Sequence, residues 1–68
     1  MSKISAEYKE IMNAKKDSIK RRGEKIADAY ETKDFLMITT ISKEHTIWSY
    51  SYFKLSKSWN IRLMTEQR

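Results

Sequence analysis

The segment DFLMITTISKEHTIWSYSYF, residues 34–53, changes the periodicity of the chain and decides its fold class. The polar segment Ser42–His45 separates two stretches that we read with a period of two: before it, Phe35, Met37, Thr39 and Ile41 interleave with Leu36, Ile38 and Thr40, and after it Trp48, Tyr50 and Tyr52 alternate with serines, which is typical of a β-hairpin. The alternation resumes after a second turn near Leu55–Lys57. We therefore expect three antiparallel strands in a meander, at about residues 35–41, 46–54 and 58–64.

The expected register gives this sheet two unlike faces. We expect the first turn to centre on residues 43–44, which pairs Met37 with Tyr50. A second turn centred on residues 55–56 pairs Tyr50 with Ile61. Trp48, Tyr50, Tyr52 and Trp59 then share one face, which is the natural floor for a helix. The opposite face is half apolar and has no cover within the chain, so we interpret it as a candidate protein interface. Its candidate residues are Leu36, Ile38, Ile47, Phe53, Arg62 and Met64.

Residues 4–31 follow a helical period instead. At 100° per residue, their apolar side chains fall within about 80° of Ile19 and form one stripe. This stripe consists of Ile4, Tyr8, Ile11, Met12, Ile19, Ile26, Ala29 and Tyr30. Lys15 and Arg22 interrupt it, and we expect their alkyl stems to cover the edge of the core while their charges reach water.

Gly23 is the one ambiguous position in this helical segment. It follows the three cations of residues 20–22, as glycine does at the C-terminus of a helix. The stripe nevertheless keeps its phase across Gly23, because Ile26 and Tyr30 follow Ile19 at helical spacings. We therefore expect one continuous helix over about residues 4–31, straight or bent at Gly23, with a hairpin of two helices as the alternative.

The expected fold is a single α+β domain over residues 1–68, in which a long N-terminal amphipathic helix packs on a three-stranded antiparallel β-meander. A helix of about 27 residues spans about 40 Å, whereas strands of this length span about 25 Å. The helix would overhang the sheet, and a protein partner or a second copy would cover its surplus apolar surface. A chain of 68 residues is also close to the size at which monomers become marginal, which favours a homodimer.

The composition excludes several classes of function. The sequence has no cysteine and one histidine, so we expect no disulfide, no thiolate chemistry, no metal site and no cofactor. No apolar run approaches the roughly 20 residues of a membrane span, and residues 1–5 lack the apolar stretch of a signal peptide. We expect a cytoplasmic protein that does not associate with membranes. Its abundance of lysine and isoleucine is typical of an AT-rich genome, such as that of a phage or mobile element.

The net charge of +5 permits contact with nucleic acid. One flank of the expected helix carries the candidate phosphate-contacting residues Lys9, Lys16, Lys20, Arg21 and Lys25. An acidic ladder on the same helix would repel phosphate. It consists of Glu10, Asp17, Glu24 and Asp28. We therefore interpret the basic flank first as an ordinary solvated helix face, and nucleic-acid binding is the alternative function.

Catalytic residues are scarce in this sequence. His45 stands alone in a predicted turn, and there is no glycine-rich phosphate loop. We expect no enzyme, although a small toxin-like ribonuclease that uses His45, Lys54, Arg62 and a tyrosine is a second alternative. In the order of its elements, helix and then meander, the chain is similar to bacterial ribosome-dependent toxin nucleases and, less so, to double-stranded-RNA-binding domains. No sequence motif carries either similarity, and neither assigns a residue.

Surplus apolar surface and missing catalytic chemistry together favour a function in binding. The leading hypothesis is a small non-enzymatic regulator or inhibitor that binds a protein partner. The contact would use the uncovered sheet face or the overhanging helix.

Overall fold

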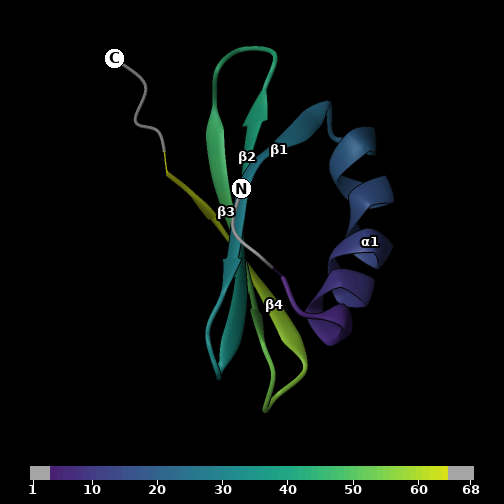
Figure 1. Ribbon diagram of the computed structural model, residues 1–68. Coiled ribbons are helices and arrows are strands. Elements are labelled where there is room, and N and C mark those ends of the chain that lie inside the picture. The colour runs from purple at the N-terminus through teal and green to yellow at the C-terminus, as the bar shows by residue number, and fades with distance from the viewer. Residues whose placement is uncertain (1–3, 65–68) are drawn as a thin grey trace.

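The computed structural model describes residues 4–64 as one helix followed by a four-stranded antiparallel sheet (Figure 1). The elements are α1 (Ala6–Arg21), β1 (Glu24–Glu31), β2 (Phe35–Ser42), β3 (Ile47–Phe53) and β4 (Ser58–Leu63). The strands pair in chain order, β1-β2-β3-β4. The α+β class is confirmed, but the sheet has one strand more than the three expected.

The additional strand comes from residues that were expected to continue the helix. α1 ends at Arg21, and Gly23 has φ +77°, a left-handed conformation that side chains disfavour and that often ends helices. The Gly23 N–H donates to the carbonyl of Lys20 at 2.9 Å, which closes the last turn. A helix continuous through Gly23 is therefore wrong, and so is the hairpin of two helices, because the segment after the glycine is β1.

A β-bulge explains why β1 follows the helical stripe in the sequence. The register of β1 against β2 shifts between Ile26 and Asp28, so Ala27 is an extra residue. As a result Ile26 and Ala29, three residues apart, both lie on the sheet face that α1 covers, opposite Thr40 and Ile38. A spacing of three on one face imitates a helix, although the backbone is extended.

The shorter helix matches the sheet in length. The 16 residues of α1 span about 24 Å, and the eight residues of β1 or β2 span about 26 Å. The expected overhang of the helix is therefore wrong. α1 lies along one face of the sheet and packs against β1 and β2, and no element of residues 4–64 lies on the other face (Figure 1).

The first of the predicted turns contains one residue more than expected. Ser42 donates its N–H to Thr46 at 2.9 Å, and His45, with φ 64°, closes a loop of three residues. Ile38 therefore pairs with Tyr50, and the predicted pairing of Met37 with Tyr50 is wrong. The pairing of Tyr50 with Ile61 across the second turn is confirmed.

This slip of one residue exchanges the two faces of β2. Leu36 and Ile38, predicted on the uncovered face, lie instead beneath α1 with no exposed surface. Together with Tyr50 they form the floor of the core. The buried apolar residues are Tyr8, Met12 and Ile19 from α1, with Ala29, Leu36, Ile38 and Tyr50 from the sheet.

Candidate functional site

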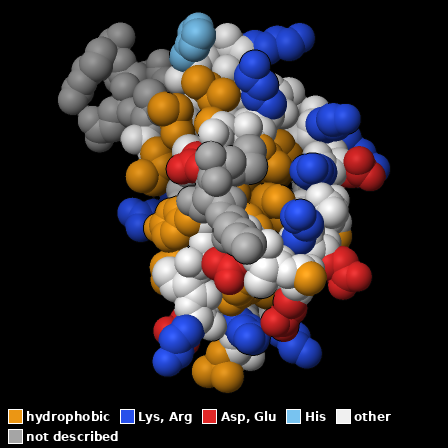
Figure 2. Space-filling view, viewed as in Figure 1, with side chains coloured by type: hydrophobic (Ala, Val, Ile, Leu, Met, Phe, Trp, Pro, Cys, Tyr) orange, Lys and Arg blue, Asp and Glu red, His pale blue; other side chains and the backbone are white. Residues whose placement is uncertain are grey.

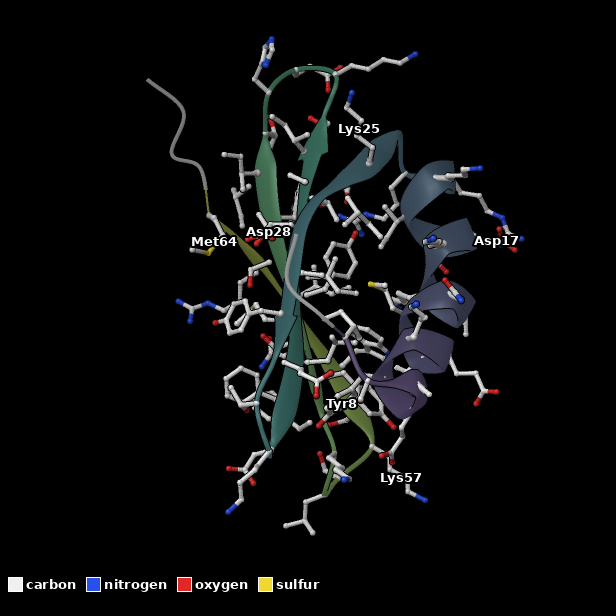
Figure 3. All side chains as sticks on the ribbon, in the orientation of Figure 1. Tyr8, Asp17, Lys25, Asp28, Lys57 and Met64 are labelled. Atoms are coloured by element: carbon white, nitrogen blue, oxygen red, sulfur yellow. The ribbon has the colours of Figure 1, made fainter. Side chains whose placement is uncertain are left out.

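The sheet face turned away from α1, here called the outer face, carries apolar residues at about half of its positions. Its apolar residues are Tyr30, Phe35, Met37, Ile41, Ile47, Phe53 and Met64. Tyr30 and Phe35 meet edge to face with ring centroids 6.4 Å apart, and Phe35 lies 6.0 Å from Phe53. Tyr30, Phe53 and Met64 are exposed. The labelled side chains Asp28 and Met64 in Figure 3 lie on this side of the sheet, whereas Tyr8 lies between the sheet and α1.

Four of the six candidate interface residues lie on the outer face: Ile47, Phe53, Arg62 and Met64. Leu36 and Ile38 do not, because they belong to the core. The alternation alone missed Tyr30, Phe35, Met37 and Ile41. Recognising a three-residue loop at 43–45 would have placed the three members of β2 correctly, since the faces follow from the register.

Basic residues gather at the end of the sheet where α1 stops. Lys20, Lys25, Lys43 and His45 line an open depression around Ile41, and Lys16 joins Lys20 and Lys25 in a neighbouring one. We call these four lysines and one histidine the basic end: Lys16, Lys20, Lys25, Lys43 and His45. Figure 2 shows blue Lys and Arg side chains over the helix side and the upper end, where the pale-blue histidine also lies.

The basic end overlaps only in part with the predicted basic flank. Lys16, Lys20 and Lys25 are brought together, but Lys25 lies on β1 and not on a helix. Lys9 lies nearly two turns before Lys16, towards the other end of α1, and Arg21 is exposed in its last turn. The sequence does not predict Lys43 as a member. The β2–β3 turn lies near the end of α1 only because β1 follows the helix and pairs with β2.

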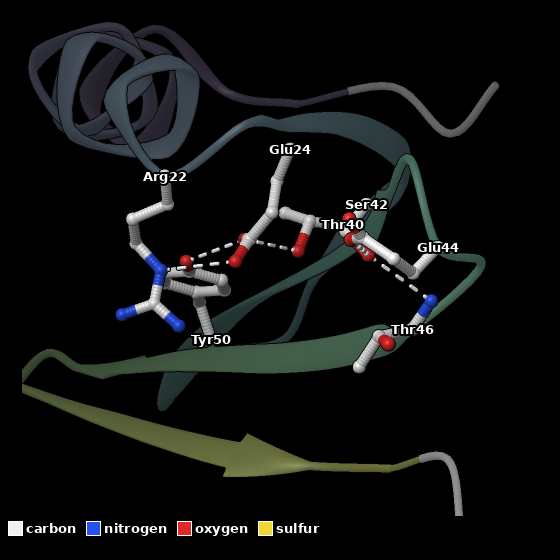
Figure 4. Close-up of polar contacts among 7 residues, drawn as sticks. All are labelled: Arg22, Glu24, Thr40, Ser42, Glu44, Thr46 and Tyr50. Carbon is white, nitrogen blue, oxygen red and sulfur yellow. Dashed lines mark hydrogen bonds and ion pairs between the residues drawn. The ribbon is translucent and has the colours of Figure 1, made fainter. Parts of the chain in front are cut away.

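A buried carboxylate lies beneath this end (Figure 4). Glu24 Oε1 accepts hydrogen bonds from the Tyr50 hydroxyl and the Thr40 hydroxyl, each at 2.7 Å. Its Oε2 accepts the Arg22 Nε–H at 2.9 Å. The side chain of Glu24 is only 2% exposed. The predicted acidic ladder on the helix is therefore wrong at Glu24, which is buried on β1, and at Asp28, which lies on the outer face of β1.

These hydrogen bonds set the protonation states of the cluster. Burial by itself would raise the pKa of Glu24, but the hydrogen bonds from Tyr50, Thr40 and Arg22, with the charge of Arg22, lower the pKa below its ordinary value. Burial, and next the hydrogen bond to Glu24, raise the pKa of Tyr50 to about 12. At neutral pH the carboxylate is ionised, the tyrosine is neutral, and all three donors are engaged by the carboxylate, Arg22 from a partly exposed position. The cluster therefore joins the end of α1 to β1, β2 and β3.

The two cations that interrupt the helical stripe lie against aromatic rings. The Arg22 guanidinium lies 4.8 Å from the ring centroid of Trp48 and 5.8 Å from that of Tyr50. The Lys15 ammonium lies 5.1 Å from Trp59. Cation–π contacts of this kind let a charged residue occupy the edge of an aromatic core. Lys15 and Arg22 were predicted to cover the edge of the core, and each charged group lies over a tryptophan ring there.

The residues considered for a ribonuclease do not meet. His45 and Lys54 lie at opposite ends of β3, while Arg62 pairs with Ser49 on the outer face. Among residues 4–64, no group of His, Asp and Glu is arranged to hold a metal ion. Within the same residues, no helix is long and apolar enough to cross a membrane.

The two most deeply buried tyrosines should differ in how loss of the hydroxyl affects stability. Tyr50→Phe removes a hydrogen bond to a buried carboxylate and should lower the free energy of unfolding by about 1.5–3 kcal/mol. Tyr8→Phe should leave it unchanged or slightly higher, because the Tyr8 hydroxyl is buried without a hydrogen-bond partner in the described structure. Urea unfolding of both variants measures the difference. Equal losses would show that Glu24 does not depend on Tyr50.

Comparison with known proteins does not indicate a function for this chain. The chain matches no protein-family model, no curated protein and no solved structure. The features that can support a function are therefore the outer face, the basic end and the buried cluster around Glu24.

Proposed function

We propose that this chain acts by protein–protein binding through its outer face, as a small non-enzymatic regulator or inhibitor. The observation that carries the proposal is the row of apolar side chains on the outer face. A four-stranded sheet with one helical layer ordinarily presents polar residues to water on its other face. Here seven apolar residues occupy that position, and three of them are exposed aromatic or methionine side chains.

The chemistry of the outer face resembles that of a protein interface. Contiguous apolar patches on small proteins mark interaction sites, and aromatic residues, methionine and arginine are enriched at their centres. The outer face supplies all of these, with Phe35 and Phe53 in ring contact and Arg62 exposed beside Ser49. Thr39, Ser49 and Ser51 lie between them. The hydroxyls of Ser49 and Ser51 donate to the sulfur of Met37 at 2.8 and 3.3 Å.

Removing apolar surface from the outer face should abolish partner capture without unfolding the chain. Ile47→Ser with Phe53→Ser makes this change, and Leu55→Ser with Leu63→Ser replaces two apolar side chains at exposed positions elsewhere. Tagged proteins expressed in the native host are captured, and the bound proteins are compared by mass spectrometry. We expect proteins that wild type and the Leu55/Leu63 variant retain and the outer-face variant loses.

Circular dichroism provides the control for folding in this experiment. If the Ile47/Phe53 variant unfolds, Phe53→Ser with Met64→Ser replaces it, because both side chains are exposed. Identical sets of captured proteins for the outer-face and the Leu55/Leu63 variants would contradict the proposal.

Nucleic-acid binding at the basic end is a second candidate function, favoured by its unpaired charge. Within residues 4–64, the ion pairs are Arg22 with Glu24 and Lys54 with Glu7, so the four lysines of the basic end have no acidic partner. Glu44 is the one acid of the β2–β3 turn, and it accepts a hydrogen bond from Ser42 at 3.3 Å. Because the charge of Glu24 is buried against Arg22, it does not oppose phosphate as the helical interpretation required.

The position of the lysines, and not their number, should determine nucleic-acid affinity. Lys20→Ala, Lys25→Ala and Lys43→Ala together should reduce the slope of log affinity against log salt by about 2–3, since each phosphate contact contributes about 0.9. Lys9→Ala, Lys33→Ala and Lys57→Ala remove the same charge outside the basic end and should change the slope little. Fluorescence anisotropy with a labelled duplex measures both. Equal reductions of the slope in both triple variants would show that only the net charge matters. Absence of binding at low salt would contradict nucleic-acid binding as a function.

A further inference from the structure

We propose that the partner of the outer face is a second copy of this chain, stacked sheet on sheet about a two-fold axis that runs parallel to the strands. This inference rests on the proposed function, because it names the occupant of the same surface. It is carried by the way charged and apolar residues are ordered across the four strands. That order is self-complementary for one choice of axis and not for the other.

One row of residues crosses the middle of the outer face. Asp28 on β1 pairs with Thr39, Thr39 with Ser49, and Ser49 with Arg62 on β4. The row therefore has an acid at one edge, a base at the other and two small hydroxyl residues between them. Neither charged residue forms an ion pair within residues 4–64, and both are exposed. Asp28 uses one oxygen to accept the N–H of Ala29 at 2.8 Å.

A two-fold axis parallel to the strands, placed between β2 and β3, exchanges the edges of the sheet and keeps each row at its own level. It sets β1 of one copy over β4 of the other, so Asp28 faces Arg62 of the second copy twice. A two-fold axis across the strands sets β1 over β1, so Asp28 would face Asp28 and Arg62 would face Arg62. Opposed like charges disfavour the second arrangement, whereas opposite charges fix the register of the first.

The apolar rows on either side match under the same axis. Ile41 of one copy comes to lie over Ile47 of the other, because these two residues pair across β2 and β3. Phe35 likewise comes to lie over Phe53, which joins the two ring pairs into one cluster of four rings. Isoleucine and phenylalanine thus fill both ends of the interface, and hydroxyl residues occupy its centre.

The twist of the sheets leaves these pairs within reach. Stacked sheets cross at about 30°, and the edge strands lie about 7 Å from the axis, so opposed edge positions are displaced by about 4 Å. A long arginine side chain can span such a displacement. The same axis places the two basic ends at one end of the dimer, so that a single polyanion could contact both.

Charge reversal at Asp28 and Arg62 tests the proposal. Asp28→Arg and Arg62→Asp should each raise the dimer dissociation constant at least about ten-fold, because each creates two like-charge contacts. The double variant, Asp28→Arg with Arg62→Asp, restores opposite charges and should return the constant to near the wild-type value. Asp17→Arg and Lys57→Asp make the same charge changes away from the outer face and should have no effect. Sedimentation velocity from about 1 μM to about 1 mM measures all of them.

Each outcome of this experiment decides something. A dimer that the single variants weaken and the double variant restores supports the proposal. A wild-type chain that stays monomeric, or a dimer that the double variant does not restore, overturns it. If Asp28→Arg unfolds, Asp28→Asn keeps the acceptor for Ala29 and should still weaken the dimer. The wild-type chain could also be monomeric while the variant with Ile47→Ser and Phe53→Ser fails to capture some other protein that the wild type binds. This result would refute the second copy as the partner and leave the proposed function intact.

Discussion

The buried carboxylate of Glu24 is the interaction on which the other features of this structure depend. It receives one donor from each of three segments: Arg22 at the end of α1, Thr40 on β2 and Tyr50 on β3, while Glu24 itself begins β1. A buried charge without partners would cost several kcal/mol, so the three donors have to arrive together. Gly23 makes this possible, because its left-handed turn brings Glu24 back under the residue that caps the helix.

The arrangement fixed at Glu24 determines which surfaces remain for binding. With α1 turned back over β1 and β2, one face of the sheet becomes core, and no element of residues 4–64 covers the outer face. The same turn brings Lys20 beside Lys25 and the β2–β3 loop, which creates the basic end. The two candidate surfaces therefore share one structural cause, although their chemistry differs.

How far the sequence predicts this structure depends on local signals at a few residues. The second hairpin is predicted in its correct register, because a turn of four residues centred between Leu55 and Ser56 places Tyr50 opposite Ile61. The first hairpin was not, since His45 adopts a left-handed conformation that only glycine or asparagine would have announced. The sequence of β1 predicts a helix, because the bulge at Ala27 places inward-facing residues three apart. No sequence signal predicts the burial of Glu24, because its partners come from three other segments. The outer face is only half identified from the sequence, because the one-residue error in the first hairpin exchanges the two faces of β2.

A carbon-detected NMR titration of the Glu24 side-chain carboxyl shows whether this group is ionised inside the fold. We predict a pKa below the ordinary glutamate range, because the donated hydrogen bonds and Arg22 outweigh burial. The ionised form would then stabilise the fold at neutral pH, and this contribution would be lost as the pH falls through the lowered pKa. A carboxyl that titrates at or above the ordinary range would contradict the account, because burial would then outweigh its three donors.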